Sequence, residues 1–116
     1  MNNDKPVAPA HRLPEGLERY SRTATFSEET LPAGLRKDHT TKAGSWGRIC
    51  VEQGVLRYRV TDPRRIPSQR DLTPDTKPGV VEPTIIHHVE PVGSVRFYIE
   101  FLRGSATPIS PREQKT

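Results

Sequence analysis

The sequence predicts an all-β fold, a small double-sheet jelly roll of seven to nine strands. Twelve prolines and eight glycines divide the 116 residues into short pieces. Within these pieces apolar and polar side chains alternate with a period of two, and the signals for helices are weak. Many short alternating segments separated by turn residues are typical of β-sandwiches and β-barrels.

The clearest strands are predicted at residues 46–52 and 55–60. Gln53-Gly54 between them suits a tight hairpin turn, because glycine accepts a positive φ. The alternation assigns one inner face to Ile49, Val51, Leu56, Tyr58 and Val60. A closing strand is predicted at 95–101, where one face comprises Val95, Phe97, Ile99 and Phe101. Shorter strands are predicted at 23–26, 33–37, about 70–73 and 80–82.

The composition predicts one folded domain with loose ends. Hydrophobic residues make up only 32% of the chain, against about 45–50% on an ordinary count that includes glycine. The deficit is concentrated at the termini, which are rich in proline, serine, threonine and charge. We therefore expect a loosely ordered N-terminal segment at 1–16, a β domain at 17–103 and a flexible tail at 104–116.

Several classes of protein are not expected. The single cysteine, Cys50, excludes an internal disulfide and a multi-cysteine zinc site. No apolar run approaches the ~20 residues that cross a bilayer, and no apolar secretory signal is present, so we expect a cytoplasmic protein without a membrane partner. The net charge is +4, but basic residues are interleaved with acidic ones and no aromatic stacking motif occurs, so nucleic acid is not an expected partner.

Two histidine-containing segments stand out. One reads His-Thr-Thr-Lys-Ala-Gly-Ser-Trp-Gly at 39–47, and the other reads Pro-Thr-Ile-Ile-His-His-Val-Glu-Pro at 83–91. Histidine is the side chain best suited to bind a transition metal or transfer a proton near neutral pH. Because each segment adjoins a predicted strand, we predict that His39 and His87 converge inside one β enclosure.

These segments resemble the small cupin-like family formed by the N-terminal domain of the tellurite-resistance protein TehB and the stand-alone YeaR-like proteins. The resemblance covers about residues 17–103. It rests on Pro32, Gly34, His39, Thr41, Lys42, Gly44, Ser45, Trp46, Gly47, Gly54, Pro83, His87, Val89, Glu90, Phe97 and Phe101. It implies a cupin jelly roll, often dimeric, with a small central cavity and a link to tellurite or other oxyanion stress.

The resemblance also implies where a metal would bind. Metal-binding cupins use two histidines spaced by one residue, a glutamate further along, and a histidine in the second motif. His39 matches the first of these ligands and His87 the last. Thr41 occupies the position of the second histidine, and Gly47 lies near the position of the glutamate.

A divalent Zn, Fe or Mn ion requires a third donor besides His39 and His87. The candidates are Glu90 and His88. Strand alternation places Glu90 on the face opposite His87, unless a bulge before Pro91 redirects it. Alternatively, the two imidazoles are satisfied by protein groups or water without a metal. The further candidate pocket residues are Thr41, Lys42, Trp46, Tyr58 and His88.

Three functions remain open from the sequence. The first is a small protein that binds a divalent metal or a small anionic ligand through His39 and His87. The second is a ligand-binding or structural homodimer without metal or catalysis, and the third is a metal-dependent enzyme acting on a small molecule. No Gly-rich strand-to-helix turn is present, so S-adenosylmethionine chemistry is not expected, and no nucleophile elbow supports a hydrolase.

A homodimer is expected from the residues opposite the core. Arg57, Arg59, Arg96 and Tyr98 are predicted on outward strand faces. Edge strands of small jelly rolls are often covered by a partner, because an open edge exposes unpaired backbone groups.

Overall fold

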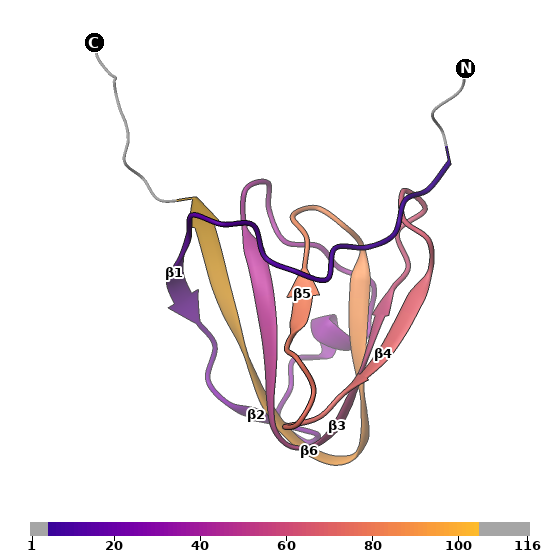
Figure 1. The fold of residues 1–116 in the computed structure, drawn as a ribbon. Coiled ribbons are helices and arrows are strands. Elements are labelled where there is room, and N and C mark those ends of the chain that lie inside the picture. The colour runs from indigo at the N-terminus through magenta and orange to yellow at the C-terminus, as the bar shows by residue number, and fades with distance from the viewer. Residues whose placement is uncertain (1–4, 105–116) are drawn as a thin grey trace.

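Two long antiparallel strands organise the computed structural model, which describes residues 5–104 (Figure 1). They are β3 (Trp46–Val60) and β6 (His87–Gly104), and they pair along their length. The shorter strands are β1 (Leu17–Arg22) and β2 (Phe26–Ser27), which pair with β6, and β4 (Ser68–Leu72) and β5 (Gly79–Val81), which pair with β3. All pairings between strands are antiparallel. The all-β prediction is confirmed, and the sheet is consistent with a cupin-type jelly roll.

The β3–β6 ribbon bends in its middle, where the sequence predicts a hairpin turn. The register shifts between Val51 and Gln53 and again between Gly54 and Val55, so both strands contain bulges there. Gly54 has a φ of 80°, and a Cβ on it would overlap the carbonyl oxygen of Ser94. The predicted hairpin at Gln53-Gly54 is therefore wrong, because the glycine serves a bulge inside one continuous strand. The described residues accordingly form six strands rather than seven to nine.

The predicted inner face is nevertheless confirmed. Ile49 is buried before the bend and Leu56, Tyr58 and Val60 are buried after it, while Val51 packs against them partly exposed. Buried positions change from odd to even numbers across the bulge, as they also would across a hairpin. On β6 the predicted face is buried at Val95, Phe97 and Ile99, and Phe101 packs against the same core.

Three local predictions need correction. Residues 33–37 do not form a strand, because Ala33–Arg36 is a 3-10 helix, η1, that begins after Pro32. The strand expected at 23–26 is reduced to β2 at Phe26–Ser27. β1 at Leu17–Arg22 was not expected, since most of its side chains are exposed and its alternation is weak. The strands expected near 70–73 and 80–82 correspond to β4 and β5.

The N-terminal residues 5–16 run across one end of the sheet in Figure 1. They are irregular, but Val7 bridges to Arg65 and the backbone N–H of Ala10 donates to Glu82 at 3.0 Å. The tail expected at 104–116 lies, apart from Gly104, outside the described residues. Among residues 5–104 no helix has the length and apolar character to span a bilayer. The homodimer stays a prediction.

A candidate histidine pocket

His39 and His87 are brought together by a short backbone bridge. The N–H of His39 donates to the carbonyl of His87 at 2.9 Å, and the N–H of His87 donates back to His39 at 3.0 Å. Directly paired residues of an antiparallel bridge project their side chains to the same face. The two imidazole rings therefore lie side by side, with centroids 4.2 Å apart and planes tilted by 55°. The structure thus places the two rings together, as the sequence predicts.

The hydrogen bonds of the two rings determine which nitrogen of each ring is left to contact a ligand. Nδ1 of His39 lies 2.9 Å from the carbonyl oxygen of Lys37, and Nδ1 of His87 lies 2.9 Å from that of Ile85. A carbonyl oxygen only accepts, so each Nδ1 carries the hydrogen. In a neutral imidazole the other nitrogen, Nε2, then presents a lone pair.

His87 is neutral at pH 7. Burial lowers the pKa of His87 from its ordinary value of 6.5 to about 4, because a charged imidazolium is poorly solvated there. The ring of Tyr58 packs edge-on against it, with centroids 5.8 Å apart. The Tyr58 hydroxyl donates to the carbonyl of Val80 at 2.8 Å. Nε2 of His87 is therefore a Lewis base rather than a cation.

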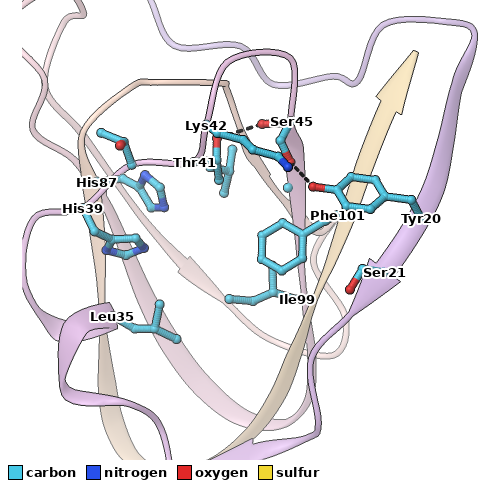
Figure 2. Close-up of a pocket in the computed structure, with 13 residues that line it drawn as sticks. Tyr20, Ser21, Leu35, His39, Thr41, Lys42, Ser45, His87, Ile99 and Phe101 are labelled. Carbon is cyan, nitrogen blue, oxygen red and sulfur yellow. Dashed lines mark hydrogen bonds between the residues drawn. The ribbon is translucent and has the colours of Figure 1, made fainter. Parts of the chain in front are cut away.

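The rings line a cavity of about 370 Å³ between β1, β3, β6 and the loop before β3. Figure 2 shows the histidines on one side of this cavity and Tyr20 and Phe101 on the other. The lining residues are Tyr20, Ser21, Leu35, His39, Thr40, Thr41, Lys42, Ser45, Gly47, Val81, His87, Ile99 and Phe101. Most of this surface is hydrocarbon, so the site is a small apolar chamber with polar groups at two ends.

The mouth of the pocket is built by the loop before β3. The hydroxyl of Thr41 donates to the carbonyl of Ser45 at 2.7 Å, and the N–H of Ser45 donates to Lys42 at 3.1 Å. Gly44 has a φ of 82°, which suits the glycine in this turn. The Ser45 hydroxyl lies 2.6 Å from that of Tyr20 on β1 (Figure 2). These bonds fix Lys42 and Ser45 at the edge of the chamber.

Not all predicted site residues lie in the pocket. Thr41 and Lys42 line it, and Tyr58 supports His87 without lining it. Trp46, His88 and Glu90 do not line it. Each is next in sequence to a buried residue, namely Gly47, His87 or Val89, so strand alternation turns it outward.

Glu90 in particular does not join the two histidines. β6 is regular here, and the bulge that would redirect Glu90 before Pro91 is absent from the register. The carboxylate instead lies 3.6 Å from Arg59 and 3.6 Å from Nε2 of His88. Among residues 5–104 no group of three or more histidine, cysteine, aspartate or glutamate side chains is arranged to hold a metal. A metal here would have two protein donors.

The sequence did not show that several residues together form one wall of the pocket. These residues are Tyr20, Leu35, Val81, Ile99 and Phe101. Ile99 and Phe101 belong to the predicted core face of the closing strand, and the pocket opens on this face. Tyr20 and Leu35 belong to β1 and η1, the two elements whose structure was not expected. No local signal relates these positions to His39.

A family model described as TehB-like domain matches residues 21–99. The chain therefore belongs to the TehB-like family. Two curated relatives from Haemophilus influenzae, strains KW20/Rd and 10810, are each named probable S-adenosyl-L-methionine-dependent methyltransferase TehB. They are 31% and 29% identical over 72 residues, which cover 61% of this chain and 25% of each relative. The chain thus spans about a quarter of their length.

Two solved structures show a similar fold. The crystal structure of TehB from Haemophilus influenzae superimposes with a TM-score of 0.70 at 25% identity, over 78% of this chain and 32% of that chain. The crystal structure of a protein from E. coli strain K12 superimposes with a TM-score of 0.73 at 20% identity, over 84% of this chain and 100% of that chain. The second likeness shows the fold alone.

Proposed function

We propose that this TehB-like domain binds a small ligand in the pocket, with Nε2 of His39 and His87 contacting the polar group of the ligand. The observation that supports it is the pair of rings whose Nδ1 atoms are held by backbone carbonyls. That arrangement orients both Nε2 atoms without using them in any hydrogen bond found among the described residues. Each Nε2 therefore keeps a lone pair that a donor group of a ligand in the pocket can use.

The wall of the pocket limits the chemistry of the ligand. Neutral His87 accepts a hydrogen bond, so the group that meets it is a hydroxyl, an N–H or a metal-bound species. The apolar wall of Leu35, Val81 and Phe101 favours a ligand with a hydrocarbon part. The domain on this proposal is a binding module, and no aspartate or glutamate is among the described residues that line the pocket.

A fragment screen tests the proposal. Small alcohols and phenols are added to ¹⁵N-labelled protein, and binding is read from the side-chain nitrogen shift of His87 and the amide of His39. Wild-type protein is expected to bind several fragments with millimolar affinity, and His39→Ala is expected to weaken them about tenfold. His11→Ala, at an exposed position of the N-terminal segment, is the matched control and is expected to change nothing. If no fragment perturbs either ring, the proposal fails.

A second candidate is a divalent metal held by the two imidazoles, with water or an anionic ligand completing the coordination. It is favoured by the Nδ1–H···O=C bonds, since ligating histidines almost always donate their other N–H to such a group. Zinc, iron or manganese would then be found in protein purified without chelator, measured by elemental mass spectrometry. Loss of that metal in His39→Ala but not in His11→Ala supports it, and metal-free wild-type protein that zinc does not stabilise rules it out.

The activity named for the relatives is not transferred here. The methyltransferase TehB is about four times as long as the matched segment, since that segment covers 25% of it. A role in tellurite or other oxyanion stress is proposed only through the family resemblance.

A further inference from the structure

We propose that the mouth of the histidine pocket is an anion-binding seat, formed by Lys42, Arg103, Tyr20 and Ser45. The inference deepens the proposed function, because it adds that the ligand of the pocket carries a carboxylate, phosphate or other oxyanion at its outer end. Only this statement about the ligand rests on the proposed function. The seat itself stands on geometry that is independent of the histidines.

Two cations converge on one aromatic ring at the mouth. The Nζ atom of Lys42 lies 5.9 Å from the centroid of the Tyr20 ring, and the guanidinium carbon of Arg103 lies 4.4 Å from it. They come from elements that are distant in sequence, the loop before β3 and the end of β6. Cation–π contact orients each cation but does not neutralise its charge.

A second cavity, of about 310 Å³, lies between these groups. Its lining residues are Tyr20, Lys42, Ala43, Gly44, Ser45, Arg103 and Gly104. Tyr20, Lys42 and Ser45 also line the histidine pocket, so the two cavities adjoin. In Figure 2 Lys42 and Tyr20 approach each other across this mouth, whereas the histidines lie on the opposite wall. One elongated ligand therefore has a path from the imidazoles to the two cations.

The charge of these cations is not neutralised by a carboxylate of the described residues, in contrast to that of several other arginines. Arg19 and Arg48 share Glu100, and Arg65 pairs with Glu82. Neither Lys42 nor Arg103 has a carboxylate within ion-pair distance in the part of the chain that the structure describes. The nearest acid by register is Glu18, opposite Arg103 on β1. Counting that carboxylate, the mouth keeps a net positive charge.

The hydroxyl pair adds a hydrogen-bond donor to the seat. The Tyr20 and Ser45 oxygens are 2.6 Å apart, so one hydroxyl donates to the other. Two hydroxyls have two hydrogens, and this bond uses one. The second hydrogen is left to donate to an anion held between Lys42 and Arg103, a combination of charge and directed hydrogen bond that suits an oxyanion.

Inorganic phosphate is the probe that tests the seat without knowledge of the natural ligand. It is titrated at constant ionic strength into ¹⁵N-labelled protein while the amides of residues 42–45 and 103 are followed. We expect saturable shifts at these amides with a dissociation constant in the millimolar range. Lys42→Gln and Arg103→Gln are each expected to weaken phosphate at least about threefold, and the double variant to remove the saturable shifts.

The matched control is Lys77→Gln, which removes one positive charge from an exposed loop that lines neither of the two cavities. It is expected to bind phosphate as the wild type does. Equal weakening in Lys77→Gln, or no saturable shift at 42–45 and 103 in the wild type, would overturn the seat. Melting temperatures of all variants identify any that fail to fold, and Arg103→Lys, which keeps the charge, is expected to retain binding.

The two proposals fail in different ways. His39→Ala is expected to leave phosphate binding at the mouth within about twofold of the wild type, because His39 is not part of the seat. Loss of fragment binding with intact phosphate binding would contradict the histidine pocket alone. Intact fragment binding without phosphate binding would contradict the anion seat alone.

Discussion

His87 and His88 are neighbours on β6, yet they have opposite environments. His87 is 4% exposed, lies in the pocket wall and bonds only to a backbone carbonyl. His88 faces outward, where Nδ1 lies 2.9 Å from Asp38 and Nε2 lies 3.6 Å from Glu90. Strand alternation alone separates them, since successive side chains point to opposite faces of a sheet. Residue type therefore does not identify the functional histidine, whereas its face does.

The difference is one of partners as well as burial. The inner ring has an Nε2 atom left for a ligand, and the outer ring has carboxylates near both nitrogens. Asp38, which accepts from Thr61 at 2.8 Å as well, adjoins His39 in sequence. The outer histidine thus ties the segment that contains His39 to β6 from behind, and the inner histidine meets the ring of His39 in front. The inner face of β6 therefore carries the candidate site, and the outer face holds the segment that contains His39 in position.

The largest expected effect is on the pH dependence of stability. The pKa of His87 is about 4 in the folded protein and about 6.5 when unfolded. Above pH 6.5 both states are neutral, so His87 contributes no pH dependence. As the pH falls from 6.5 to 4 the unfolded state takes up a proton that the folded state does not, and stability decreases by about 3 kcal/mol. Urea unfolding of His87→Leu between pH 7 and 4 is expected to lack this decrease.

The comparison with the outer histidine sharpens this measurement. His88→Leu is expected to retain the decrease, because the buried imidazole is still present. Each variant lacks one imidazole and keeps all other titratable groups, so the difference between the two variants isolates the buried position of His87. An unchanged slope in His87→Leu would show that the inner ring is not kept neutral by burial.

A smaller effect is expected when the contacts of Asp38 at the outer face of β6 are removed. Asp38→Ala removes the acceptor of both His88 and Thr61, so the segment that contains His39 should open more often. Exchange of the His39 amide hydrogen, which is bonded to the His87 carbonyl, is expected to accelerate about tenfold. Fragment binding in the pocket should weaken several-fold.

The control variants separate positioning from loss of charge. Asp38→Asn keeps an oxygen acceptor and is expected to give an intermediate effect. Asp75→Ala removes a carboxylate from an exposed turn and should leave His39 exchange as it is in the wild type. Equal acceleration in Asp75→Ala would mean that Asp38 acts only through net charge.

Alternation predicted which faces are buried but not how the strands connect. The change of phase between Val51 and Leu56 fits a hairpin and fits a bulge equally well, because both displace the pattern by one residue. Only the pairing partner distinguishes them, and here β3 pairs with β6 over its whole length. That partner lies about forty residues away, so the local sequence contains no information on the choice.

The candidate site shows the same limit. His39 and His87 were identified from residue type and strand context, and Glu90 was placed by alternation on the face where it is found. Tyr20 and Arg103 were not identified, because their roles arise from the pairing of β1 with β6. Leu35 was not identified for a similar reason, because it lies in η1, which follows Pro32 where a strand was expected. Residues that act through neighbours in space require the topology.

The smallest expected effect is that of Glu90→Gln, and it decides whether Glu90 serves the site. Its contact with Arg59 is 3.6 Å long, and both side chains are nearly half exposed. Solvent screens such pairs, so the free energy of unfolding should change by less than about 1 kcal/mol. Fragment or zinc binding, measured by calorimetry beside His39→Ala, should be unaffected, because the carboxylate lies on the outer face. A loss of binding comparable to that of His39→Ala would mean that β6 rearranges to bring Glu90 inward. The inner and outer faces of β6 would then not keep their separate roles when a ligand is bound.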